Sequence, residues 1–306
     1  MSVSSKPSGR PRGFAPLDYV LYAVAVLVWG LSWIALHYQV GQVAPEVSVV
    51  WRFGIAAPLM LMFAAWRGER LTFRLAEHRY FIGLGAAIFS TNFALFYYAG
   101  IHIASGLLSI VFSLAAIGNV ALGNLIFGTR VERRVLIGAA CGVVGVALMF
   151  YPELGGVEFG AGALMGLALS LAGTVCFCLG NMLSLAAQRK GLPIFATIGW
   201  SMAYGVVLMA LFALLRGDRF TVEWSAAYLG GLLYLSVIGS VIAFGVYFTL
   251  LGRIGAARAG YTTVMYPVIA LIVSTFAENY RWSVLAVLGL VAVLAGILLV
   301  LRAPKT

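Results

Sequence analysis

Apolar and polar positions alternate along the chain in long blocks. Runs of about 20 apolar residues recur, separated by short segments that carry Gly, Pro, Arg and Glu. Each run is long enough to cross the hydrocarbon core of a bilayer, about 30 Å thick, as an α-helix. The pattern predicts ten membrane-spanning helices, at approximately residues 18–38, 46–66, 79–98, 103–127, 133–151, 160–186, 195–215, 226–250, 256–277 and 283–302.

The composition agrees with a membrane protein. Of the 306 residues, 62% are hydrophobic and only 10% are charged, whereas soluble domains contain about 25% charged residues. The net charge of +10 could suggest a nucleic-acid partner, but the basic residues lie singly or in small groups between apolar runs, which argues against one. Residues 1–17 form a polar tail, and the apolar run that follows is too long for a cleaved signal sequence. We therefore expect that run to be retained as the first span.

The positions of Lys and Arg predict the orientation. If the N-terminus is cytoplasmic, the inner segments hold 16 basic residues and the outer loops hold three, with Arg52 inside a span. Basic residues concentrate on the cytoplasmic side of membrane proteins. Because losing one span would scramble this bias, it supports the even count as well. We expect both termini to be cytoplasmic, in a multi-pass protein of the plasma (inner) membrane.

Two pairs of spans resemble each other. The segment 105–114 in the fourth span can be laid over 259–268 in the ninth, with Gly106 on Gly260, and the fifth and tenth spans both contain glycines seven residues apart. Both pairs are five spans apart, an odd number, so the second copy must lie upside down relative to the first. The predicted fold is all-α and integral to the membrane, with ten transmembrane helices in two inverted-topology five-helix repeats, 18–151 and 160–302.

Short motifs add a family resemblance. Trp29-Gly-Leu-Ser-Trp33, Pro45 at the start of the second span, and Arg52-Phe-Gly-Ile-Ala56 resemble the opening of EamA-type families in the drug/metabolite transporter superfamily. The second half resembles that family's repeat at Pro267 and Glu278, although Ser113 stands in the first repeat where the second has Pro267. The resemblance covers residues 18 to 302 and implies ten helices and export of metabolites such as amino acids.

Acidic residues are missing from the centres of the apolar runs. All ten Asp and Glu residues fall at span ends or in loops, whereas a buried carboxylate is the usual proton relay or counter-ion for a cationic drug. A proton-coupled cation pump is therefore disfavoured, although backbone carbonyls could still bind Na⁺. An intramembrane enzyme is disfavoured as well, because no span contains Asp, Glu or a pair of His. We expect no cofactor and no metal, since Cys176 and Cys178 point to opposite sides of a helix.

Neutral polar and aromatic residues at helical spacing remain as candidates for substrate binding. They suit a neutral or zwitterionic solute, because rings cover an apolar side chain while hydroxyls and amides meet charged groups. Each alone could instead hold two helices together. Asn92 and Asn181 need polar partners and so should face protein or water. The candidates are Trp29, Trp33, Asn92, Phe96, Ser109, Thr174, Asn181, Ser240, Phe244, Tyr247, Tyr261 and Tyr266.

Two single residues allow two interpretations each. Pro267 lies in the middle of the ninth span, where it removes a backbone hydrogen bond, and it is either a gate hinge or a static bend. Arg52 either holds a substrate carboxylate or reaches to the outer surface or to the carbonyls of a neighbouring helix. The predicted function is export of small metabolites, neutral or aromatic amino acids foremost, by alternating access. The alternatives are an ion-coupled exporter of another metabolite or drug, and a channel- or scramblase-like pore.

Overall fold

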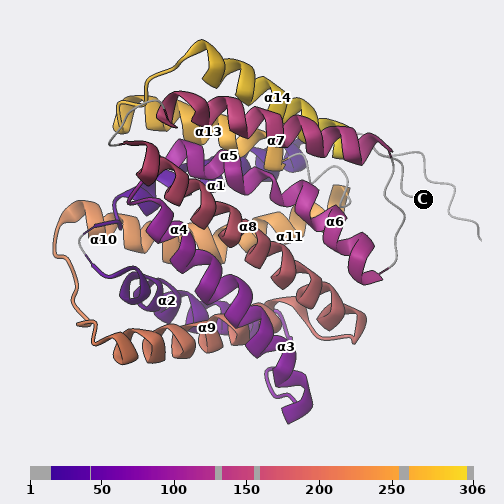
Figure 1. Ribbon diagram of the computed structural model, residues 1–306. Coiled ribbons are helices and arrows are strands. Elements are labelled where there is room, and N and C mark those ends of the chain that lie inside the picture. The colour runs from indigo at the N-terminus through magenta and orange to yellow at the C-terminus, as the bar shows by residue number, and fades with distance from the viewer. Residues whose placement is uncertain (1–14, 42, 128–132, 155–158, 255–261, 302–306) are drawn as a thin grey trace, which may run out of the picture.

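A computed structural model describes residues 15–41, 43–127, 133–154, 159–254 and 262–301, and this part of the chain is helical without any strand (Figure 1). The helices and π-helical segments run, in chain order, as α1 (Pro16–His37), α2 (Pro45–Trp66), α3 (Leu75–Ala86), η1 (Ala87–Asn92), α4 (Phe93–Ala99), α5 (Ser105–Ser113), α6 (Ala115–Phe127), α7 (Arg133–Leu154), α8 (Phe159–Arg189), α9 (Ile194–Arg216), α10 (Ala226–Leu233), η2 (Tyr234–Ile242), α11 (Ala243–Ile254), α13 (Thr262–Ala277) and α14 (Val284–Leu301).

The predicted all-α membrane class is confirmed. Within the described residues, seven helical stretches are long and apolar enough to cross a membrane: 16–37, 45–66, 75–99, 105–126, 161–189, 194–216 and 226–247. Three further apolar helices, over 136–152, 265–277 and 284–299, are shorter. Helices form throughout because a helix satisfies its own backbone hydrogen bonds where lipid supplies no partner.

Helix ends follow local sequence chemistry. Proline occupies the first turn of α1 and of α2, at Pro16 and Pro45, where its missing N–H has no partner to lose. Helix α9 ends at Gly217, whose φ of 77° places it in the left-handed region that closes many helices. Helix α10 begins after Ser225, whose hydroxyl accepts the Tyr228 N–H at 3.2 Å.

Three of the predicted spans are interrupted, which the apolar pattern did not predict. The third is α3–η1–α4 and the eighth is α10–η2–α11, each with π-helical turns at its centre, and the fourth is divided into α5 and α6 at Leu114. Ser90 Oγ donates to the Gly85 carbonyl at 3.0 Å and Ser240 Oγ to that of Leu235 at 2.8 Å, in both cases five residues back. Such turns often mark functional positions in helices.

Two pairs of helices lie side by side along much of their length, α7 with α14 and α2 with α9 (Figure 1). Glycines allow α7 and α14 to touch backbone to backbone. A Cβ atom at Gly145 would lie 2.6 Å from the Gly289 carbonyl oxygen, and one at Gly289 would lie 2.5 Å from that of Gly145. These glycines therefore serve close packing of the two helices.

Candidate functional site

Aromatic rings from four helices meet around Phe112 of α5. Its ring centroid lies 5.6 Å from Trp33 of α1, 5.5 Å from Phe96 of α4, 4.7 Å from Phe177 of α8 and 6.3 Å from Tyr266 of α13. Trp33 and Phe96 also contact each other at 5.4 Å. These separations are the ordinary range for interacting rings. Three of the predicted residues, Trp33, Phe96 and Tyr266, are thus brought together around Phe112, and Phe177 is a member that the sequence did not point to.

Trp29, one turn before Trp33 on α1, contacts a second group of rings. Its centroid lies 5.0 Å from Tyr247 and 6.1 Å from Phe244, both on α11. Phe244 in turn lies 6.5 Å from Phe89 of η1, which lies 5.3 Å from Phe53 of α2. We call Trp29, Trp33, Phe96, Phe112, Phe177, Phe244, Tyr247 and Tyr266 the ring cluster.

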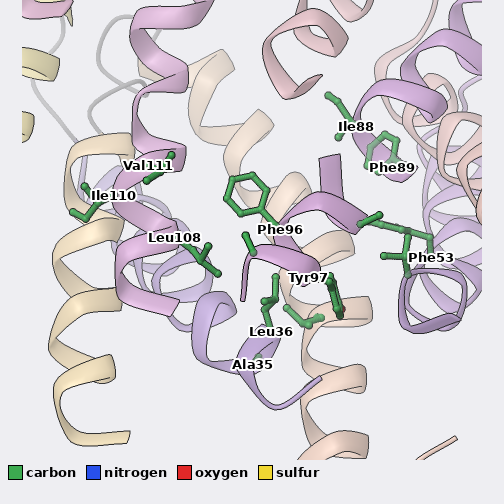
Figure 2. Close-up of a cluster of buried hydrophobic side chains, with 14 of the residues drawn as sticks. Ala35, Leu36, Phe53, Ile88, Phe89, Phe96, Tyr97, Leu108, Ile110 and Val111 are labelled. Atoms are coloured by element: carbon green, nitrogen blue, oxygen red, sulfur yellow. The ribbon is translucent and has the colours of Figure 1, made fainter. Parts of the chain in front are cut away.

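The ring cluster combines buried and half-buried side chains. Phe96 and Tyr266 are buried, whereas the two tryptophans and the rings of α5, α8 and α11 remain partly accessible. Figure 2 shows Phe53 and Phe89 side by side and Phe96 turned toward Leu108 and Val111 of α5. Rings that are not fully packed can offer their faces to an apolar ligand, so the cluster is a candidate binding wall.

The two predicted asparagines have protein partners, as expected. Asn92 Nδ2 donates to the Gly173 carbonyl on α8 at 2.8 Å, and Asn181 Nδ2 donates to Asn119 Oδ1 on α6 at 3.1 Å. Both bonds join two helices across the bundle interior. Asn119 was not predicted, because nothing in the pattern of α6 distinguishes it from a surface residue.

The predicted hydroxyl groups bond within their own helices. Ser109, Thr174 and Ser240 donate to carbonyls three to five residues earlier, at 2.6, 2.8 and 2.8 Å. Their oxygens keep acceptor capacity, but their single donors are used. Tyr261 lies outside the described residues. Pro267 lies inside α13, directly after Tyr266 of the ring cluster.

A buried glutamate ties three helix ends together where α1 ends. The Glu278 carboxylate follows α13 and accepts from His37 Nδ1 at 3.0 Å, from the Ser105 N–H at 3.0 Å, and from the Ser105 hydroxyl. Burial alone would raise the pKa of Glu278, but the hydrogen bonds from His37 and Ser105 favour the charged form and hold that pKa below its ordinary value. Ser105 opens α5, so the helix N-terminus also attracts this charge.

A second buried glutamate lies where α2 begins, at the same end of the bundle. Glu46 is fully buried and its Oε1 accepts from the Tyr98 hydroxyl at 2.5 Å and from Arg216 Nη1 at 3.2 Å. Arg216 also donates to the Tyr98 oxygen at 2.8 Å. From the sequence these residues could be assigned only to the ends of spans. Glu46 and Arg216 are 170 positions apart, and a pair so distant leaves no local sequence pattern.

An apolar groove lies apart from the ring cluster. It has a volume of about 540 Å³ and lies between α3, η1, α6 and α8. Its lining residues are Gly83, Ala86, Ala87, Thr91, Ile126, Cys176, Leu179, Met182, Leu183 and Ala186. None of the predicted binding residues lines it. Within the described residues, no group of three or more His, Cys, Asp and Glu side chains could hold a metal ion.

Comparison with known proteins identifies the family of this chain. The sequence matches the EamA-like transporter family over residues 17–151 and again over 164–302. The chain belongs to that family. The EamA-like relatives include proteins named "probable amino-acid metabolite efflux pump" in Escherichia coli K12, 24% identical over 92% of this chain and 93% of the relative, and in Salmonella typhimurium, 25% identical with the same coverage. An Escherichia coli inner membrane transporter, YedA, is 26% identical over 87% of this chain and 84% of its own.

A crystal structure of 17% sequence identity shares the fold, with a TM-score of 0.65 over 92% of this chain and 95% of the other. The protein is therefore a multi-pass EamA-like membrane transporter, which acts on a small-molecule substrate in a lipid environment. The ring cluster draws on both matched segments. Trp29, Trp33, Phe96 and Phe112 come from the first, and Phe177, Phe244, Tyr247 and Tyr266 come from the second.

Proposed function

We propose that this EamA-like transporter exports small metabolites, neutral and aromatic amino acids foremost, by alternating access between two inverted five-helix halves. The ring cluster carries this proposal. Its rings come from both matched segments and several of them remain half-buried, which suits the apolar side chain of a passing solute. The names of the efflux-pump relatives agree with export.

Three pairings, each five predicted spans apart, support the inverted repeat. The third and eighth spans both carry central π-helical segments, η1 and η2. The two long side-by-side pairs, α2 with α9 and α7 with α14, join the second span to the seventh and the fifth to the tenth. Such correspondences are what two halves related by a two-fold axis in the membrane plane would produce. We further propose the inner membrane and cytoplasmic termini, from the bias of basic residues.

Counterflow in liposomes tests the proposal. Purified protein would be reconstituted into vesicles loaded with unlabelled L-phenylalanine, and entry of labelled L-phenylalanine would be measured against its concentration. We expect saturable counterflow, and we expect Trp33→Ala, Asn181→Ala and Tyr266→Ala each to lower kcat/KM about tenfold or more, which corresponds to about 1.4 kcal/mol.

Trp224→Ala is the matched control, because this tryptophan is 81% exposed and lies outside the ring cluster. It should transport as the parent does. Flux that rises linearly with concentration would indicate a pore instead. If the Trp33, Asn181 and Tyr266 variants all transported like the parent, the substrate path would lie elsewhere in the molecule.

A further inference from the structure

Arg52 is a buried cation in the interior of α2. Only 4% of it is exposed, and its contacts are aromatic. The guanidinium carbon lies 4.3 Å from the ring centroid of Phe93 and 5.2 Å from that of Phe53. No acidic side chain of the described residues forms an ion pair with it. Glu46, the one acidic residue of α2, is held by Tyr98 and Arg216 instead.

The buried Tyr97 hydroxyl lies beside this guanidinium, close enough to interact with it as a hydrogen-bonding group. Neither Arg52 Nε nor the Tyr97 hydroxyl makes a hydrogen bond of ordinary geometry to any other of the described residues. One turn earlier on α2, Ser48 shares a hydrogen bond of 3.1 Å with the Tyr228 hydroxyl. Gln39 donates to the Tyr228 carbonyl, and its own Oε1 is buried without a partner.

This arrangement is costly as it stands. A buried charge without a counter-charge is destabilising in a protein interior, and cation–π contacts with two rings offset only part of that cost. Its burial excludes a side chain that reaches the aqueous surface, and its Nε makes no hydrogen bond to a carbonyl of the described residues.

The rings beside Arg52 continue to the ring cluster. Phe53 contacts Phe93 at 4.9 Å and Phe89 at 5.3 Å, and Phe89 contacts Phe244 of the ring cluster at 6.5 Å. Figure 2 shows Tyr97 between Leu36 and Phe53. One end of this series of aromatic contacts thus carries a cation and a hydroxyl.

We propose that Arg52 and the Tyr97 hydroxyl form a subsite for a single carboxylate, whose apolar part rests on the neighbouring rings. The planar guanidinium matches a carboxylate in two parallel hydrogen bonds. One cation and one neutral hydroxyl balance one negative charge, so a phosphate dianion fits poorly and an organic cation is repelled. The inference rests on the proposed export of amino-acid-like solutes and narrows it to carboxylate-bearing ones.

Probes that differ in one charged group test the subsite. L-phenylalanine, 3-phenylpropionate and phenethylamine share the ring and respectively carry both charges, the carboxylate alone and the ammonium alone. Binding to the purified transporter would be measured by calorimetry and by the shift of the melting temperature. We expect the first two probes to bind and phenethylamine to bind at least tenfold more weakly.

Three variants assign that preference to the site. Arg52→Gln should weaken both carboxylate probes at least tenfold, Arg52→Lys should restore part of the affinity, and Tyr97→Phe should weaken it a few-fold. Arg219→Gln, which removes an exposed guanidinium in the loop after α9, is the control and should bind as the parent does. If Arg52→Gln is not monodisperse after purification, the Lys and Phe variants carry the test.

The outcomes separate this inference from the proposed export. Equal binding of phenethylamine, no binding of either carboxylate probe, or unchanged carboxylate binding in variants at Arg52 and Tyr97 would overturn the subsite. If saturable L-phenylalanine counterflow persisted in those variants, the export proposal would remain and the subsite would be rejected. Arg52-dependent binding of 3-phenylpropionate without any counterflow would support the subsite and contradict export.

Discussion

The contact between α7 and α14 and the ring cluster are built in opposite ways. Glycines let α7 and α14 meet at backbone distance, so a single added methyl group at Gly145 or Gly289 has no room. The ring cluster is made of the bulkiest side chains, and several of them are half-buried. The first region leaves no room for larger side chains unless the helices separate, whereas rings that keep some accessible surface have room to change their neighbours.

This difference suggests a division of labour. Close packing of small residues is a main source of helix association inside lipid, where water provides no hydrophobic driving force. Partly accessible rings contribute less to stability but can cover a solute. We therefore expect changes in α7 and α14 to alter stability more than transport per molecule, and changes in the ring cluster to do the reverse.

The largest effect on stability is expected from Gly289→Ala. The new Cβ atom would lie 2.5 Å from the Gly145 carbonyl oxygen, so α7 and α14 must separate. Overpacking of this kind costs about 1–3 kcal/mol, and the melting temperature of the detergent-purified protein should fall by several degrees. Gly54→Ala is the control, because nothing lies within 4 Å of its Cβ position. An equal fall in both variants would contradict a backbone-tight contact.

A smaller effect on stability, with a larger one on transport, is expected from Phe112→Leu. The substitution keeps an apolar side chain but removes the ring that contacts Trp33, Phe96, Phe177 and Tyr266. We expect kcat/KM for L-phenylalanine counterflow to fall about tenfold, or about 1.4 kcal/mol, with a melting temperature close to the parent. Phe276→Leu, at an exposed ring, is the control. If stability fell while counterflow per folded molecule did not, the ring cluster would belong to the scaffold.

The sequence predicted the helices best where the thickness of the bilayer sets their length. The apolar runs predicted α1, α2 and α9 to within one or two residues at each end, because hydrocarbon thickness sets the length of a span. Trp29 and Trp33 were both candidate binding residues, and both belong to the ring cluster. The breaks at η1, η2 and Leu114 were not predicted, since π-helical turns depend on packing around the helix rather than on its apolar pattern.

The partners of individual side chains were less predictable. Asn92 and Asn181 required polar neighbours, but the choice of Gly173 and Asn119 depends on how each helix is rotated within the bundle. In the sequence, Glu278 could be recognised only as a residue at the end of a span. The fold brings it into contact with His37, which lies 241 positions earlier in the chain. Helix geometry determines which face a residue occupies, whereas tertiary packing determines what that face meets.

The smallest effect is expected at the helix ends, from Glu278→Gln. This change keeps the shape of the side chain but weakens its bonds with His37 and Ser105, at a cost of about 1 kcal/mol. Because the folded state holds the pKa of Glu278 below its unfolded value, the contribution is complete above the unfolded pKa, about 4.3. It is lost as the pH falls through the lowered folded value.

Melting temperatures measured from pH 7 down to pH 3 check the sign. The parent should be more stable than Glu278→Gln at pH 7, and the two curves should converge as the solution becomes acidic. Glu223→Gln is the control, since Glu223 forms no hydrogen bond or ion pair within the described part of the chain, and its curve should follow the parent throughout. A constant difference between the parent and Glu278→Gln down to pH 3 would mean that the carboxylate charge is not what holds α1, α5 and α13 together. The helix ends would then resemble the contact of α7 with α14, where shape alone decides the packing.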